Sequence, residues 1–293
     1  MTGQHDYESW LKRERPHVPV PPPGPKAKVK IAAEEAITNP CHGRGYPLVV
    51  EEGFGVWIRD TDDNVYLDCT SGIGVCNVGH SHPDVVKALC DQANKFFHYC
   101  GADFYYEQQT ILQQKLMDVV PVDNPVVFFT NSGAESTEAA MKLARYFKRG
   151  SRYLALRGAF HGRTFGAMSL TSSKGYQRAR YAPLVPQVTH VPNPYCYRCP
   201  LNLSYPACKL ACVDYIADVL ETICPAEEVA AFFAEPIQGE GGYIVPPPEY
   251  FPKLKAVLDK HGILLAIDEV QSGNGRTGKM YAIEHFGVRP GIP

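Results

Sequence analysis

The chain has 293 residues, of which 45% are hydrophobic and 20% are charged, and its formal net charge at pH 7 is -2. These values are typical of globular proteins, and the length predicts one large domain with appendages. The small net charge gives no electrostatic reason to expect a nucleic acid or an anionic membrane as partner. Residues 1–15 are polar without a signal-peptide core, and no apolar run is long enough to span a bilayer, so we expect a soluble, cytoplasmic protein.

The N-terminal part of the chain predicts an extended segment followed by short strands. Five prolines between Pro19 and Pro25 favour an extended path over the surface rather than a core element. Three short runs rich in β-branched and aromatic residues follow, separated by glycine-rich and aspartate-rich turns, at residues 48–50, 56–59 and 65–68. This pattern indicates a small antiparallel meander.

The pattern then changes to helices and to an alternation of strands with helices. Pro83 suits the first turn of a helix, and residues 108–119 predict a second, amphipathic helix. Further on, apolar strands are expected at 126–129, 153–156, 229–233 and 262–267, and helices at 136–147, 212–223 and 250–261. Continuously apolar strands separated by helices predict an α/β fold with a largely parallel sheet that is covered on both faces.

Small residues follow the first of these strands. Ligands of open α/β sheets bind outside the carboxyl ends of the strands, so the residues after each strand are the ones to consider. Ser132, Gly133 and Ala134 lead into a helix, where backbone N–H groups and the helix N-terminus favour a phosphate. Glu135 is placed to cap this helix. The alternative is an ordinary strand-to-helix turn.

An aromatic residue and an arginine follow the second strand. Phe160 can cover one face of a planar ring, and Arg163 can bind a carboxylate in bidentate fashion. The common alternatives are a core position for Phe160 and a surface charge for Arg163.

Acidic residues follow the last two strands. Glu235 and Glu240 stand in a glycine-rich loop, where they would orient ligand groups or pair with surface lysines. Asp268 ends an apolar strand, and an acid at such a position needs a cation, for which a protonated pyridinium ring would serve. Gln271 would then reach a phenolic oxygen on the same ring. The alternative is that Asp268 caps the segment after it.

The cysteines offer one further motif. Ten cysteines in a cytosolic chain are expected to be thiols rather than disulfides. One group has the spacing of metal ligands, a CxxC followed by a second pair, which would suit zinc or an iron–sulfur cluster: Cys196, Cys199, Cys208 and Cys212. The alternative, which we adopt as the expectation, is an irregular surface loop of the large domain with reduced cysteines and no bound metal.

Taken together and in this order, the motifs resemble the class III, or acetylornithine/4-aminobutyrate, aminotransferases of pyridoxal 5'-phosphate (PLP) fold type I. The matching strings lie at residues 72–75, 79–80, 130–145, 160–164, 235–242 and 265–286. The resemblance implies a mostly parallel sheet of the seven-stranded type with helices on both faces. It also implies that residues 1–75, an N-terminal extension with the meander, belong to a small domain and that residues 76–293 belong to the large PLP-binding domain.

The resemblance implies PLP as cofactor, an amino acid and a 2-oxo acid as substrates, and a homodimer. Ser132 and the backbone of Gly133 and Ala134 would bind the phosphate, and Phe160 would cover the ring face. Asp268 would pair with the ring nitrogen, Gln271 would bind the phenolic oxygen, and Glu235 would support the site. Arg163 would take the substrate carboxylate, and Glu240 would gate a second arginine.

One departure from the family pattern concerns the lysine that forms the Schiff base. In the family it follows the segment of Asp268 and Gln271 by one strand, so here it would lie beyond Pro293, together with most of the small domain. Lys279, in a glycine-rich loop, is no substitute. We therefore expect a C-terminally truncated transaminase that is inactive alone. The resemblance implies that the complete enzyme moves the amino group of 4-aminobutyrate, acetylornithine, ornithine or a similar amino acid to a 2-oxo acid. The alternatives are an amino-acid racemase or epimerase of the same family, or a non-catalytic PLP-binding fragment.

Overall fold

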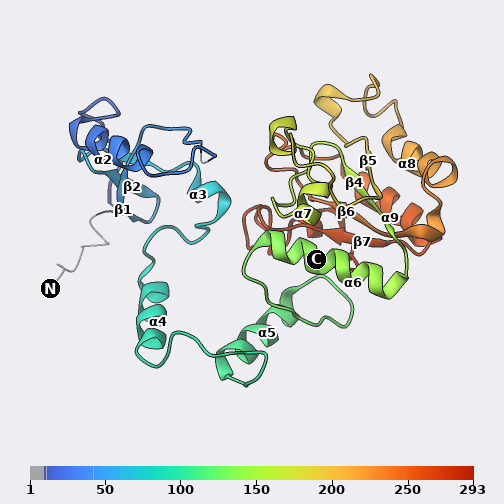
Figure 1. Cartoon of the computed structure of the whole chain (residues 1–293), viewed down its shortest axis with the longest axis horizontal. Helices are drawn as coiled ribbons and strands as arrows, with labels where there is room; N and C mark the ends of the chain where they lie inside the picture. The colour runs from blue at the N-terminus through green and yellow to red at the C-terminus, as the bar shows by residue number, and fades with distance from the viewer. Residues whose placement is uncertain (1–9, 11, 42) are drawn as a thin grey trace. The chain divides into compact units, whose positions relative to one another are not determined.

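A computed structural model describes residues 10, 12–41 and 43–293 of the chain. Two units are distinguished, residues 1–105 and 106–293, drawn from blue to turquoise and from green to red in Figure 1. The domain boundary expected after residue 75 is a different division and stays a prediction. Within the described residues, no helix combines the length and the apolar character that crossing a membrane requires.

The first unit contains the expected meander. Its strands β1 (Val50–Phe54), β2 (Trp57–Asp60) and β3 (Val65–Leu67) pair antiparallel in that order. Phe54 pairs with Trp57 around a tight turn, where Gly55 adopts a φ of 55° that suits a residue without a side chain. The proline-rich segment runs beside β3, because His17 forms an isolated antiparallel bridge with Val65.

A buried aspartate holds the helix that follows the prolines. Helix α2 (Pro25–Glu35) begins after Gly24, which has no side chain to cap it. Asp62, in the turn between β2 and β3, caps it instead: its two carboxylate oxygens accept hydrogen bonds from the backbone N–H groups of Lys26 (2.8 Å) and Ala27 (2.9 Å). The residues between the strands therefore anchor the N-terminal segment on the meander.

Substitution of Asp62 by asparagine is expected to release the first turn of α2. An amide keeps only one acceptor oxygen, so one helix N–H loses its partner, at a cost of about 1 kcal/mol. Hydrogen exchange should show lost protection at Lys26 and Ala27. Asp63→Asn is the matched control, because Asp63 forms only exposed ion pairs, with Lys26 and Arg59. Equal loss of protection in both variants would contradict this role of Asp62.

The second unit is built on a four-stranded parallel sheet of order β5-β4-β6-β7. The strands are β4 (Arg152–Leu156), β5 (Val188–Val191), β6 (Val229–Ala234) and β7 (Leu264–Ile267). The apolar runs at 153–156, 229–233 and 262–267 are thus confirmed as strands. Strand β5 was not anticipated, because its four residues include a threonine and a histidine.

Helices cover both faces of this sheet, as expected. In β6, Ala231 and Phe233 pack with α6 (Gly133–Lys148) and α7 (Phe165–Leu170). The alternate residues Phe232 and Ala234 pack with α8 (Ala211–Thr222) and α9 (Tyr250–Lys260). Every residue of β6 is buried, which accounts for its uninterrupted apolar sequence. Single 3-10 turns complete the unit: η1 (Gly175–Gln177), η2 (Cys196–Arg198), η3 (Ala226–Glu228) and η4 (Ala282–Phe286).

The strand expected at residues 126–129 is wrong. No strand is formed there, and Val126 and Phe128 are 92% and 79% exposed. An extended segment becomes a strand only when a neighbour accepts its backbone hydrogen bonds, and none of the described strands pairs with it. An apolar run alone therefore did not decide the structure.

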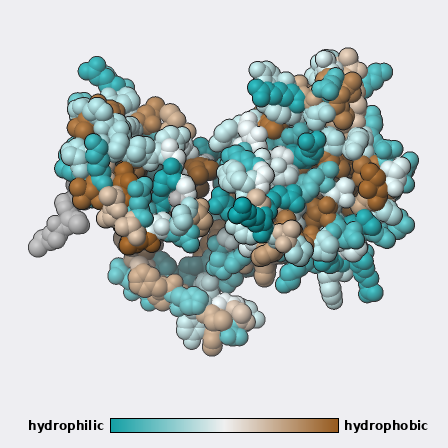
Figure 2. All heavy atoms as spheres, turned by 45° about the horizontal axis from the view of Figure 1, so that its top comes forward, coloured by the Kyte–Doolittle hydropathy of each residue, from teal (hydrophilic) through white to brown (hydrophobic). Residues whose placement is uncertain are grey.

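The helices that follow the first sheet and precede the second in the sequence expose apolar residues. The helical signals are confirmed, since α4 spans Pro83–Ala93 and α5 spans Glu107–Val119, after a short helix α3 (Ser71–Gly74). None of these three helices has a buried residue. Figure 2 shows hydrophobic residues, in brown, scattered over the visible surface of the described chain.

Candidate functional site

The ends of neighbouring strands bring the predicted segments together. The loops after β4, β6 and β7 begin at the same edge, because these strands are parallel and adjacent. The start of α6 joins them through close contacts of small residues. A Cβ atom added to Gly133 would stand 2.8 Å from Cγ2 of Val270, and one added to Gly162 would stand 2.7 Å from Cβ of Ala134.

The start of α6 is capped by Ser132, and the predicted capping residue Glu135 instead contacts the backbone just before the helix. The Ser132 hydroxyl accepts a hydrogen bond from the backbone N–H of Glu135 (3.2 Å), and the Glu135 carboxylate accepts one from the N–H of Asn131 (2.6 Å). Helix geometry leaves the first N–H groups, those of Gly133 and Ala134, without acceptors inside the helix. The positive end of a 16-residue helix thus faces the segment of Val270 with donors suited to an anion.

An ion pair stands at the end of β7. The carboxylate of Asp268 accepts a hydrogen bond from the backbone N–H of Val270 (3.0 Å), so the local cap that was the alternative interpretation of Asp268 is present. Its other oxygen lies 2.8 Å from Nδ1 of His161, whose side chain is fully buried. The side chain of Asp268 is 12% exposed. The sequence analysis did not single out His161. The available signal was Asp268, because an ionisable residue just after a buried strand needs a partner.

The surroundings of His161 favour its charged form. Burial lowers the pKa of His161, but the hydrogen bond from its ring to Asp268 and the charges of Asp268 and Glu235 more than offset this, so the pKa is raised above 6.5. The backbone of His161 is also fixed, since its N–H donates to the Thr171 hydroxyl and its C=O accepts from Thr137. Its second ring nitrogen, Nε2, is buried with no partner in the described chain.

A buried glutamate ties two of the loops together. One carboxylate oxygen of Glu235 accepts from the backbone N–H of Phe160 and the other from that of Gly239, both at 2.9 Å. Burial raises the pKa of Glu235 to about 6, although the charge of His161 and these two N–H groups act in the opposite direction. Glu235 therefore fixes where Phe160 and the glycine-rich loop stand.

Replacing Glu235 with glutamine is expected to cost about 1–3 kcal/mol, because an NH₂ group would face one of the two N–H donors. The raised pKa of Glu235 adds a pH dependence, because the folded state holds the proton of this carboxyl more tightly than the unfolded state does. The stability gained from protonating Glu235 is full below pH 4.5 and is lost as the pH rises through about 6. The difference in unfolding free energy between wild type and variant should follow that window in urea titrations. Exposed Glu227→Gln is the control; if it gives the same difference, Glu235 has no such role.

Gln271 lies against the loop that Glu235 holds. A Cβ atom added to Gly239 would stand only 1.5 Å from Oε1 of Gln271, so glycine is required for the two segments to touch. This amide oxygen is buried and has no partner among the described residues. It is therefore a polar group to which a ligand could bond.

The remaining predicted residues are partly or fully exposed. Phe160 is half-buried, and the exposed Arg163 has its guanidinium carbon 5.9 Å from the centre of the Phe160 ring. Glu240 accepts hydrogen bonds from Lys174 (2.6 Å) and Gln177 (3.2 Å), which matches the predicted alternative of a lysine partner. Lys279 is exposed beside a loop of tight turns.

A hollow of about 280 Å³ opens beside the ion pair. Its lining includes Gly133, Thr137, Asp268 and Val270, but neither Phe160 nor Gln271. The site thus combines a helix N-terminus, a buried carboxylate with a histidine partner, and an unpartnered amide. This combination suits a planar heteroaromatic ligand that carries a phosphate.

The cysteine motif lies elsewhere in the second unit, in the loop between β5 and α8 and in the first turn of α8. All four cysteines are free thiols. Among the residues that the structure describes, no three His, Cys, Asp or Glu side chains are arranged as a metal site. Cys196, Cys199 and Cys208 thus lie in an irregular loop of the second unit, as the prediction of a loop had it.

Comparisons with known proteins identify relatives of the chain. The family model described as aminotransferase class-III matches residues 40–293. A leucine/methionine racemase of Thermococcus litoralis is 41% identical over 84% of this chain and 55% of its own length. An acetylornithine aminotransferase of Methanopyrus kandleri is 38% identical over 84% of this chain and 57% of its own.

Solved structures agree with these relatives. An (S)-enantioselective omega-transaminase from Thermomicrobium roseum has a TM-score of 0.82 and 33% identity, over 90% of this chain and 61% of that one. The chain therefore spans somewhat more than half the length of each of these three relatives.

Proposed function

Because the chain belongs to the class III aminotransferases, a PLP-dependent family, we propose that the strand-end site holds PLP and that the whole protein moves an amino group from an amino acid to a 2-oxo acid. The observation that carries the proposal is the ion pair of Asp268 and His161 beside the N-terminus of α6.

The residues present fit this cofactor. The carboxylate of Asp268 is oriented from two sides and keeps 12% of its side chain exposed, which suits a cationic ring nitrogen. The buried, unpartnered amide of Gln271 suits a phenolic oxygen, and the α6 N-terminus suits a phosphate. Gly133 and Gly239 leave no room for a side chain where the segments meet.

Each residue then has a distinct task. Bound PLP supplies the electron sink that lets the α-carbon of a substrate lose its proton. Asp268 keeps the ring nitrogen protonated, and His161 holds Asp268 in place and shares its charge. Ser132 with the backbone of Gly133 and Ala134 binds the phosphate.

The other residues position the ring and the substrate. Phe160 covers one ring face, Gln271 binds the phenolic oxygen, and Glu235 fixes the backbone of Phe160. Arg163 orients the substrate carboxylate. Glu240 would lie near the far end of the substrate, and Lys174 neutralises the charge of Glu240.

We further propose that the polypeptide of residues 1–293 does not turn over alone. The chemistry needs a lysine amine at the site, both to hold the cofactor covalently and to move the proton. Lys279 is exposed in a loop of turns, which supports its exclusion from this task.

A racemase or epimerase is the second candidate, and a specific observation favours it: the relative at 41% identity is a leucine/methionine racemase. Arg163 reads only a carboxylate, which the substrates of both reactions share. For a transaminase, 4-aminobutyrate, acetylornithine and ornithine are the proposed donors, as an acetylornithine aminotransferase is also a relative.

The two reactions differ in their need for an acceptor. Residues 1–293 would be mixed with a separately expressed C-terminal polypeptide, taken from the part of the acetylornithine aminotransferase relative that the chain does not match, and with PLP. A transaminase gives product only when a 2-oxo acid is present, whereas a racemase inverts its substrate without one. Turnover by residues 1–293 alone would contradict the proposed need for a further lysine.

We also propose a homodimer as the assembly of the whole protein. Support comes from the apolar residues that α4 and α5 leave exposed, among them Val85, Leu89 and Leu112. Sedimentation velocity should give about twice the 32.4 kDa chain mass. A chain that stays monomeric at high concentration would contradict this proposal for the described part.

A further inference from the structure

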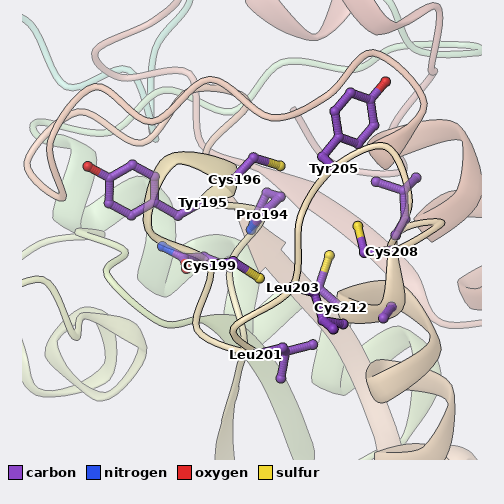
Figure 3. Close-up of a pocket in the computed structure, with 12 residues that line it drawn as sticks. Pro194, Tyr195, Cys196, Cys199, Leu201, Leu203, Tyr205, Cys208 and Cys212 are labelled. Atoms are coloured by element: carbon purple, nitrogen blue, oxygen red, sulfur yellow. The ribbon is translucent and has the colours of Figure 1, made fainter.

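Four cysteines of the loop between β5 and α8 line one small hollow. Cys196 and Cys199 stand at the two ends of the turn η2, Cys208 follows in the loop, and Cys212 lies in the first turn of α8. The hollow has a volume of about 20 Å³. Its other lining residues are mostly apolar: Asn193, Pro194, Tyr195, Leu201, Leu203, Tyr205, Leu210 and Ala211. In Figure 3 the sulfur atoms of Cys199, Cys208 and Cys212 point into the same gap.

The hollow has room for one small sphere, such as a water molecule or an ion. All four cysteines are free thiols, and three of them are partly buried. The sulfur atoms are not yet arranged as a coordination sphere. A cysteine sulfur moves by rotation about a single bond, so a change of rotamer redirects it without moving the backbone. The chain therefore brings four thiols to the lining of one hollow.

The position of Cys212 suits a metal-bound thiolate. Cys212 lies in the first turn of α8, where backbone N–H groups without helix acceptors favour a negative charge. Four thiolates that share one small hollow repel one another, and a cation at its centre removes that repulsion.

A second polar group lacks a partner close to this cluster. The side chain of Tyr250 is fully buried, and its hydroxyl has no hydrogen-bond partner among the described residues. Cys212 packs against the same apolar cluster to which Tyr250 belongs. A hydroxyl can donate to a thiolate, so an ionised Cys212 would give the buried hydroxyl an acceptor.

We propose that Cys196, Cys199, Cys208 and Cys212 bind one Zn²⁺ ion as four thiolates. The ion replaces four thiol protons, which leave to solvent, and no oxidation is involved. Four sulfur ligands in a tetrahedron are a common structural zinc site, and the small hollow suits one ion rather than a multi-iron cluster. The ion fastens the loop to the start of α8, and Tyr205 of the same loop donates a hydrogen bond to Glu249 at the start of α9.

The test uses the chain of residues 1–293, purified under reducing conditions with added zinc and then freed of loose metal. Elemental analysis should find about one zinc per chain. Separately, cobalt added to the metal-free protein should give the absorption of a tetrahedral cobalt–thiolate centre. The cobalt measurement needs no variant, so it does not depend on whether a variant folds.

Serine variants assign the ligands. Cys199→Ser and Cys208→Ser should each weaken zinc binding by more than about tenfold. Cys90→Ser, at an exposed position on α4, should not change it. Absence of zinc and of a cobalt signal, iron with acid-labile sulfide, disulfides among the four, or equal losses in the Cys90 control would each overturn the proposal.

Discussion

Replacing Asp268 with alanine should destabilise the second unit by about 3–5 kcal/mol at a pH where His161 is protonated, because it leaves a buried charge without its partner. His161 is fully buried and its ring nitrogen lies 2.8 Å from the Asp268 carboxylate. Without that carboxylate, burial prevails and the pKa of His161 should fall below 6.5. Urea unfolding and NMR titration of the imidazole measure the two effects.

The sign of the pH dependence follows from the raised pKa of His161. In the wild type, the contribution of the pair to stability is full below the ordinary value of 6.5 and is lost as the pH rises through the raised value. The alanine variant should lose this dependence.

Two further variants sharpen this prediction. Asp268→Asn keeps an oxygen that accepts from the imidazole N–H, so it should cost less stability while still lowering the pKa of His161. Asp259→Ala removes an exposed carboxylate paired with Lys255 and should change neither. An unchanged His161 titration in both Asp268 variants would contradict the pairing.

Substitution of Gly239 by alanine should displace the amide of Gln271. The added methyl group would stand 1.5 Å from Oε1 of Gln271, so the side chain must leave its place, at about 1–3 kcal/mol. Displacement of the amide that would bind the phenolic oxygen should also weaken PLP binding by about tenfold. Denaturant unfolding and titration with PLP measure these effects.

A double variant separates the clash from other causes. Gly239→Ala combined with Gln271→Ala removes the obstructing amide, so the two substitutions should cost clearly less together than the sum of each alone. Gly175→Ala, where nothing lies within 4 Å of the added atom, is the control. Additive effects would show that Gly239 is required for another reason.

Where a local rule decided the structure, the sequence predicted it. Buried runs such as Val229–Ala234 are strands because both of their faces are covered. Glu135, the predicted capping residue, does accept a backbone hydrogen bond at the start of α6, whereas the N-cap side chain itself is that of Ser132. Asp268, an acid at the end of an apolar strand, lies 2.8 Å from the imidazole of His161, whereas the expected cation was a pyridinium ring.

What depends on distant neighbours could not be predicted. His161 lies 107 residues from Asp268, and only the order of the strands places the two together. Residues 126–129 have the composition of a strand but no neighbour to pair with in the described chain. A lysine partner of Glu240 was one of the predicted alternatives, but its identity as Lys174, 66 residues away, depends on how two loops pack. The roles assigned to the site residues remain proposals that rest on this geometry.

The most direct test of the central claim is titration of residues 1–293 with PLP, followed by borohydride reduction and peptide mapping. The account predicts saturable, non-covalent binding that inorganic phosphate competes with and that Asp268→Ala weakens more than tenfold, about 1.4 kcal/mol or more. It predicts no stoichiometric phosphopyridoxyl-lysine and no turnover with an amino donor and 2-oxoglutarate. Equal binding by the wild type and the Asp268 variant, or a single fully labelled lysine accompanied by turnover, would contradict it.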